Sequence, residues 1–164
     1  MPCWLEFNRV TMPLVKRLHQ IWEQKRAGRA LPRRDDFDPA DLKQVLANLM
    51  IVEIEPAPFR LRYRLVGTTV ARVSAFDFTG RYLDDILRPD LPDDWHAYYR
   101  LAYERRCPVY GAINSPTRDG YFFVYEFGII PLSLGGDSVE QFLSLEDYGG
   151  REPHSDQLDP EKQR

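Results

Sequence analysis

The sequence predicts an α+β fold in which one antiparallel sheet is covered on one face by helices. Two segments of alternating polarity, residues 50–55 and 60–65, have the pattern of a β-hairpin. Three further strand-like segments follow at 109–114, 121–132 and 139–146, and helical patterns fill the interval between the two groups. Because a two-stranded hairpin is marginally stable alone, we expect both groups to join in a five-stranded sheet. The helical insert then lies between its second and third strands.

Charged residues indicate how the first two strands pair. One register places opposite charges on one face of the hairpin and apolar residues on the other. The predicted pairs are Glu55–Arg60, Glu53–Arg62, Ile54–Leu61 and Val52–Tyr63. A row of arginines is also typical of phosphate binding. We favour a structural role for these arginines, because two of the three, Arg60 and Arg62, already have a glutamate opposite them in the predicted register.

An amphipathic helix is predicted near the N-terminus. Apolar residues recur at helical spacing with charged and polar residues between them, and Gly28 supplies a stop signal. This apolar stripe has to be buried, and packing on its own domain and packing on a partner chain both stay open. On the second interpretation the helix forms a homodimer and signal-output surface made of Leu14, Leu18, Ile21 and Trp22.

A second helix is predicted to begin at Asp38. Asp38 is a good N-cap, Pro39 suits the first helical position, and Phe37 has the spacing of a hydrophobic staple with Leu42. The helix is expected to continue to residue 49 with one apolar face. That face consists of Leu42, Val45, Leu46 and Leu49.

The insert is predicted to contain two short helical segments, beginning near Thr68 and Tyr82, and one long helix over residues 93–106. The long helix has aspartates in its first turn and arginines in its last, as the helix dipole favours. Its predicted buried stripe is Trp95, Tyr98, Tyr99 and Ala102.

Composition narrows the function classes. Lys plus Arg number 22 and Asp plus Glu number 25, and this balance argues against a nucleic-acid-coating protein. The two cysteines cannot form a disulfide framework or a cysteine-rich zinc site. The chain shows no signal peptide, and its longest apolar run is too short to span a membrane, so a cytoplasmic protein without membrane contact is expected.

Three regions are predicted along the chain of 164 residues. Residues 1–37 hold the amphipathic helix and a linker, and residues 38–149 form the sheet domain. Residues 150–164 are polar and are expected to be a flexible tail.

Three segments together carry a resemblance to a known family. They are residues 31–39 (LPRRDDFDP), 60–68 (RLRYRLVGT) and 78–83 (FTGRYL). With the order of elements described above, the chain resembles a PAS domain of the stand-alone bacterial PAS_5 type over residues 14–148. The resemblance implies a non-enzymatic sensory or protein-interaction module in cytoplasmic signalling.

The resemblance also implies where a small ligand would bind, in a cavity between the sheet and the inserted helices. The residues expected to line it are Tyr63, Trp95, Tyr99, Tyr125 and Phe127. No metal or cofactor is expected. His96 lies on the long helix but off its apolar stripe, which disfavours haem ligation, and the insert at 70–87 has no cysteine for flavin photochemistry.

Two other functions stay open. One is a small-molecule enzyme on a cone-shaped α+β fold, with Glu126 as its buried carboxylate. That interpretation requires Glu126 to face the cavity unpaired, where burial would raise its pKa. The other is an adaptor whose core is filled and which binds no ligand.

Overall fold

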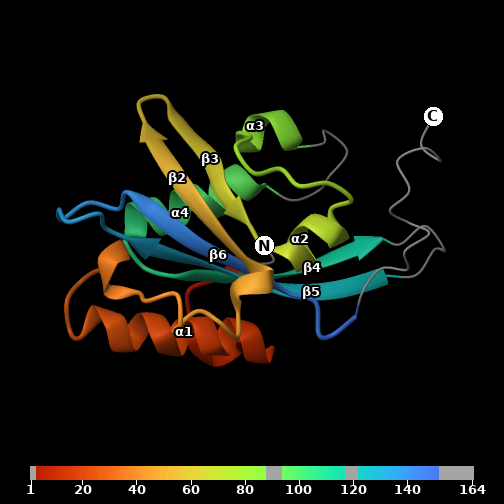
Figure 1. Cartoon of the computed structure of the whole chain (residues 1–164), viewed down its shortest axis with the longest axis horizontal. Coiled ribbons are helices and arrows are strands. Elements are labelled where there is room, and N and C mark those ends of the chain that lie inside the picture. The colour runs from red at the N-terminus through yellow and green to blue at the C-terminus, as the bar shows by residue number, and fades with distance from the viewer. Residues whose placement is uncertain (1–2, 88–93, 117–121, 152–164) are drawn as a thin grey trace.

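The computed structural model describes residues 3–87, 94–116 and 122–151 (Figure 1). The predicted tail lies almost entirely outside the described residues, as does the predicted start of the long helix at residue 93. The strands are β1 (Cys3–Trp4), β2 (Leu49–Pro56), β3 (Phe59–Val66), β4 (Val109–Pro116), β5 (Phe122–Leu132) and β6 (Gln141–Asp147). The α-helices are α1 (Pro13–Arg26), α2 (Thr68–Val73), α3 (Leu83–Ile86) and α4 (Trp95–Arg105), and short 3-10 turns occur at Phe7–Arg9, Arg34–Asp36 and Leu46–Asn48.

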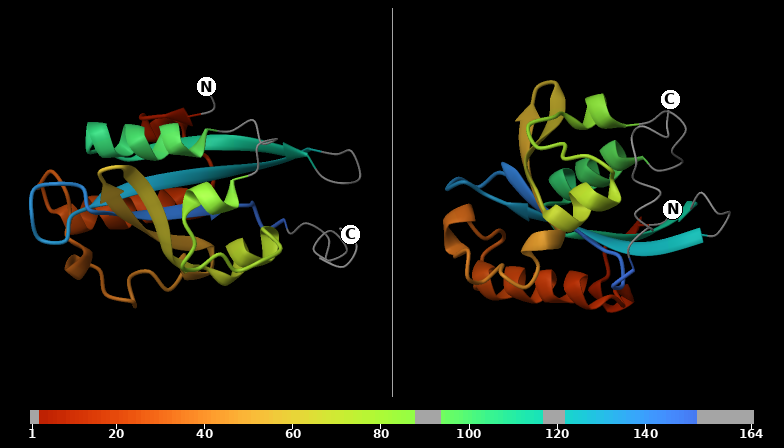
Figure 2. Two further views of the ribbon diagram at one scale, coloured as in Figure 1. Left: turned by 90° about the horizontal axis from the view of Figure 1, so that it is seen from above. Right: turned by 45° about the vertical axis from the view of Figure 1, so that its right-hand side comes forward.

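The strands form one antiparallel sheet in the order β1-β4-β5-β6-β2-β3. The helices α2, α3 and α4 all lie between β3 and β4 in the chain and cover one face, whereas α1 covers the other (Figures 1 and 2). The predicted α+β architecture with its helical insert is therefore confirmed. The strand number was wrong by one, because Cys3 and Trp4 pair with Gly111 and Tyr110 as a short sixth strand.

The predicted hairpin register is confirmed in full. The structure pairs Glu55 with Arg60, Glu53 with Arg62, Ile54 with Leu61 and Val52 with Tyr63. A bulge follows between Ile51 and Val52. The charged face makes ion pairs beyond the directly opposite residues, since Arg64 lies 3.1 Å from Glu53 and Arg60 lies 3.3 Å from Asp84.

The outer edge of β3 is occupied by a segment of the insert. The backbone N–H of Tyr63 donates to the carbonyl of Arg81 at 2.9 Å, and the N–H of Gly80 donates to the carbonyl of Tyr63 at 2.6 Å. Arg62 and Tyr82 continue this pairing as an isolated bridge. The segment leads directly into α3.

The predicted helix over residues 38–49 was wrong. The chain there makes successive turns with i→i−3 hydrogen bonds, such as Val45 N–H to the Leu42 carbonyl at 3.0 Å, and then the short 3-10 turn Leu46–Asn48. The start signals do act locally, because Asp38 accepts the N–H of Ala40 at 2.8 Å. Leu42 and Val45 are buried as expected, but Leu46 is exposed and Leu49 already belongs to β2.

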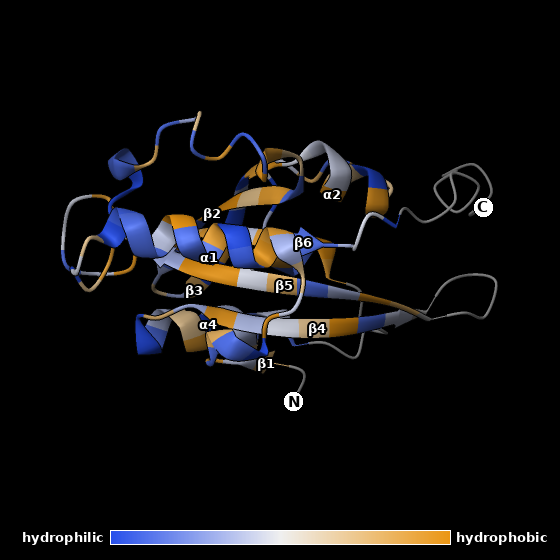
Figure 3. Cartoon of the chain, turned by 90° about the horizontal axis from the view of Figure 1, so that it is seen from below, coloured by the Kyte–Doolittle hydropathy of each residue, from blue (hydrophilic) through white to orange (hydrophobic). Residues whose placement is uncertain are grey.

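The helix α1 packs its apolar side on the sheet of its own chain (Figure 3). Leu18, Ile21 and Trp22 are buried there, and Leu14 is partly buried against the same core. The indole Nε1 of Trp22 donates to the carbonyl of Pro131 at 2.9 Å. These three buried side chains are thus engaged within the chain, and homodimerisation through this helix stays a prediction.

Close approach of α1 to the sheet depends on a glycine in β5. A Cβ atom at Gly128 would lie 3.2 Å from Cγ1 of Val15, nearer than ordinary van der Waals contact. The glycine therefore lets the first turns of the helix lie directly on the strand. Among the described residues, no helix has the length and apolar content needed to cross a membrane.

Candidate functional site

The five side chains that were predicted to line a ligand site all lie in the layer between the sheet and α4, three on the sheet and two on the helix. Tyr63, Tyr99 and Phe127 are buried, whereas Trp95 and Tyr125 are only partly buried. They come from β3, α4 and β5, which lie far apart in the sequence. The alternation of β5 places Tyr125 and Phe127 on the face toward α4, so the face left undecided by the sequence is now assigned.

The helix α4 holds its aromatic residues over the sheet. Its start is fixed by Asp94, whose side chain accepts the N–H of Ala97 at 3.0 Å. Tyr98, Tyr99 and Ala102 of the predicted stripe are buried. The ring of Trp95 at the helix start lies 4.9 Å from that of Phe127, centroid to centroid, so this residue closes one side of the cluster.

A chain of hydroxyl groups runs through the middle of the cluster. Tyr63 is hydrogen-bonded to Tyr99, and the Tyr99 hydroxyl donates to Oγ of Ser144 at 3.0 Å. Burial raises the pKa of Tyr99 to about 12 and raises that of Tyr63 as well. Both phenols are therefore neutral at pH 7, and their polar atoms are satisfied by one another.

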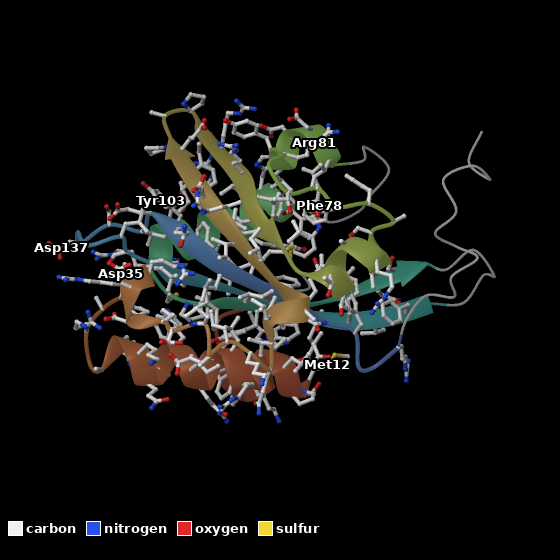
Figure 4. All side chains as sticks on the ribbon, in the orientation of Figure 1. Met12, Asp35, Phe78, Arg81, Tyr103 and Asp137 are labelled. Carbon is white, nitrogen blue, oxygen red and sulfur yellow. The ribbon has the colours of Figure 1, made fainter. Side chains whose placement is uncertain are left out.

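The ring of Phe78, which is labelled in Figure 4, packs edge-on against that of Tyr63 with centroids 4.7 Å apart. Phe78 comes from the connection between α2 and α3. The insert therefore contributes aromatic side chains to the site from two places, this connection and α4.

Sequence reasoning missed a polar row on β6. Ser144, Glu146 and Tyr148 alternate along the strand and its end, and therefore share the helix-covered face with Phe142. The Tyr148 hydroxyl donates to Oε2 of Glu146. Burial raises the pKa of Glu146 to about 7, and the Tyr148 hydrogen bond opposes this shift. The alternation itself was the signal that could have identified these residues.

Aromatic rings gather around Tyr148, the hydrogen-bond partner of Glu146. The ring of Tyr148 lies 5.2 Å from Tyr125 and 5.9 Å from Phe123, centroid to centroid. Glu146, Phe123 and Tyr125 are partly exposed, whereas Tyr148 is buried. The centre of the site thus holds the hydroxyl groups of Tyr63, Tyr99 and Ser144. Its solvent-facing end holds the carboxyl group of Glu146 and the neighbouring aromatic rings.

Glu126 lies on the opposite face of the sheet, which is a correction to the proposal that it serves as a cavity carboxylate. It is buried under the start of α1 and accepts the Met12 N–H at 2.8 Å and the Thr11 N–H at 3.0 Å. The Thr11 hydroxyl also donates to it at 2.5 Å. Strand alternation dictates this placement once Phe127 faces the other way.

Asp147 lies beside Glu126 on the adjacent strand, because the two residues are direct partners in the β5–β6 register. Its carboxylate accepts the Leu14 N–H at 2.8 Å. Together the two carboxylates bind N–H groups of the chain entering α1 and of its first turn, which a helix leaves without partners of its own. Their role is to anchor α1 on the sheet. Met12, at this end of the helix, is labelled in Figure 4.

His96 points away from the site. Its Nε2 lies 2.8 Å from Oδ1 of Asp84 in α3, where His96 is half-buried and Asp84 is exposed. Within the described ranges 3–87, 94–116 and 122–151, no three His, Cys, Asp or Glu side chains cluster as a metal site would require. The chemistry that the arrangement offers is binding, through hydroxyl, carboxyl and aromatic groups.

The solved structures that resemble this chain include three Light-Oxygen-Voltage proteins. An RNA-binding Light-Oxygen-Voltage (LOV) receptor is 20% identical with a TM-score of 0.49, covering 78% of this chain and 38% of that one. The blue-light photoreceptor Aureochrome1 LOV, in its light state, is 12% identical with a TM-score of 0.47, covering 77% and 98%. A fungal LOV domain photoreceptor is 16% identical with a TM-score of 0.44, covering 62% and 73%. The chain thus spans well under half of the RNA-binding receptor.

Curated proteins give no match to this chain. The family model described as PAS domain, in its PAS_5 form, matches residues 10–145. This match includes α1, the hairpin, the insert and β6 as far as Leu145, whereas Glu146 and Tyr148 of the site lie just beyond it. The chain therefore belongs to the PAS domain family.

Proposed function

We propose that this protein is a non-enzymatic sensory module of cytoplasmic signalling that binds a small ligand between its sheet and its inserted helices. The proposal rests on the polar row Ser144, Glu146 and Tyr148 of the helix-covered face, in which Ser144 and Tyr148 are buried and Glu146 is half-buried. A core that served only for packing gains nothing from a carboxyl group there, since burying a charge costs free energy unless it is paired. Such a group is better explained as part of a recognition site.

A route from the site to the outer surface follows from the arrangement of β6. Glu146 faces the site, and the next residue, Asp147, holds Leu14 of α1 on the other face. A ligand that prefers one position of β6 or of α4 changes the population of states in which α1 is firmly anchored. A partner protein that contacts α1 would then detect the ligand.

Glu126 is not available as the catalytic carboxylate that the alternative enzyme function requires. Both oxygens of Glu126 already accept hydrogen bonds at the start of α1, and the residue faces away from the site. A carboxylate held in this way does not accept a proton from a substrate on the opposite face of the sheet.

The test is native mass spectrometry of the freshly isolated full chain, compared with its mass under denaturing conditions. We expect a mass excess that disappears on denaturation. The variant Ser144→Val removes the acceptor of the Tyr99 hydroxyl and is expected to lower this occupancy, whereas Ser138→Val, in an exposed loop, leaves it unchanged. Circular dichroism checks that both variants fold. A native spectrum with the bare chain mass alone would favour the ligand-free adaptor and reject our proposal.

A further inference from the structure

Resting on the proposed ligand site, we propose that its ligand is a small aromatic organic cation, an amine or an amidine. The positive charge is held by the carboxylate of Glu146, and the ring lies against Phe123 and Tyr125. Three features of the described residues carry this inference: the free capacity of the carboxylate, the rings beside it and the charge state of its neighbours.

The carboxyl group of Glu146 has unused acceptor capacity. A carboxylate offers about four acceptor positions, and one hydrogen bond, from the Tyr148 hydroxyl, is formed in the described part of the chain. The described residues give it no ion pair. Other carboxylates do have cationic partners, as Glu53 does with Arg64 at 3.1 Å and Asp36 with Arg29 at 2.6 Å. A cation supplied by a ligand would complete the environment of Glu146.

The rings beside Glu146 are suited to a cationic ligand with an aromatic body. Aromatic faces attract positive charge, most strongly when water is excluded, and offset or edge-to-face ring pairs add further stabilisation. Phe123, Tyr125 and Tyr148 are mutual neighbours with ring centroids 5.2 to 6.0 Å apart. The partial exposure of Phe123, Tyr125 and Glu146 allows a ligand to reach them from solvent.

Among the described residues, no positively charged group shifts the pKa of Glu146. Tyr148 is hydrogen-bonded to it, and the charge of Glu146 in turn raises the pKa of Tyr63 and of Tyr99. Burial raises the pKa of all three phenols, so they are neutral near pH 7. An anionic ligand would repel the carboxylate, and a neutral one would leave its charge uncompensated. A cation is the class that this environment selects.

The probes are three compounds with the same phenol ring and different charges. Tyramine is a cation, N-acetyltyramine is neutral and 4-hydroxyphenylacetate is an anion at pH 8. Isothermal titration of the full chain is expected to show binding of tyramine at least tenfold tighter than either analogue. Because binding needs the ionised carboxylate, tyramine affinity should fall as the pH is lowered from 8 to 6.

Two variants assign the charge recognition to one residue. Glu146→Gln keeps the shape and is expected to lose at least tenfold in tyramine affinity together with its pH dependence. The control Glu53→Gln removes a carboxylate that is already paired on the hairpin surface and should bind tyramine as the unmodified chain does.

The outcomes separate this inference from the proposed function. Equal or tighter binding of the neutral or anionic analogue, or no binding of tyramine, overturns the cationic ligand. If tyramine fails this test but the native mass spectrum still shows a bound molecule, the proposed ligand site is retained and only the cationic class of the ligand is rejected. If it shows the bare chain, the proposed function fails as well.

Discussion

Glu146 and Asp147 are consecutive residues on opposite faces of β6, and their environments differ sharply. Asp147 accepts backbone N–H groups of Leu14 and Gly149 at 2.8 and 2.9 Å, and its strand partner Glu126 is likewise bound to the start of α1. Glu146 has a phenol as its partner and a pKa raised by burial. The comparison teaches that backbone donors make a buried carboxylate structural, whereas Glu146, which accepts no side-chain hydrogen bond from backbone among the described residues, is the group to which we assign recognition in our proposal.

The substitution Glu126→Ala tests whether the carboxylates under α1 anchor that helix, and it has the largest expected effect. It leaves the Thr11 and Met12 donors without an acceptor in a partly buried place, and we expect a loss of about 3 kcal/mol in the free energy of unfolding. Urea denaturation measures it. The control Glu53→Ala, on the exposed hairpin face, should cost less than about 1 kcal/mol. An equal loss in both variants would show that Glu126 does not anchor α1.

The other face is tested by the pH dependence of stability in ligand-free protein. The ordinary pKa of a glutamate is 4.5, and burial raises that of Glu146 to about 7. Between these values the folded chain holds a proton that the unfolded chain has lost, so its stability falls as the pH rises from about 4.5 to about 7 and then levels off.

The variant Glu146→Gln should remove this slope. Allowing for its partial exposure, we expect the variant to be more stable than the unmodified chain by about 2 kcal/mol at pH 8, with little difference at pH 4.5. Urea denaturation across this pH range measures both, with Glu53→Gln as the control that keeps the slope. A slope that persists in Glu146→Gln would place its origin in another group.

The smallest expected effect concerns the contact of α1 with β5. Gly128→Ala introduces a Cβ that meets Cγ1 of Val15 at 3.2 Å, so the helix has to shift slightly, at a cost of about 1 kcal/mol. Thermal unfolding is the measurement. Gly136→Ala is the matched control, since its new Cβ meets the end of the flexible Glu140 side chain. No difference between the two would show that α1 has room to spare.

Patterns repeated along an element were predictable from the sequence. The hairpin register followed from its alternating charges, because one alignment alone satisfied Glu53 and Glu55 together. The buried stripe of α4 followed from the spacing of its aromatic residues. In both cases the information lies within one or two adjacent elements.

Features that depend on distant parts of the chain were not predictable. Alternation in β5 separated Glu126 from Phe127 but could not assign either to a face, because that depends on where α1 packs. The strand β1 has two residues and therefore no periodicity to detect. At residues 38–49 the sequence has the signals of a helix start, but the chain forms turns and a short 3-10 segment instead. The reason is that Leu49 and the residues after it pair with β6 as part of β2.

The segment Gly80–Tyr82 on the outer edge of β3 has a consequence for self-association. Its hydrogen bonds use the Tyr63 N–H and carbonyl that an incoming strand would otherwise claim. At the opposite margin, β1 covers only Tyr110 and Gly111 of β4, which has eight residues. Because Gly80–Tyr82 already occupies it, the edge of β3 at Tyr63 is a poor template for intermolecular strand addition.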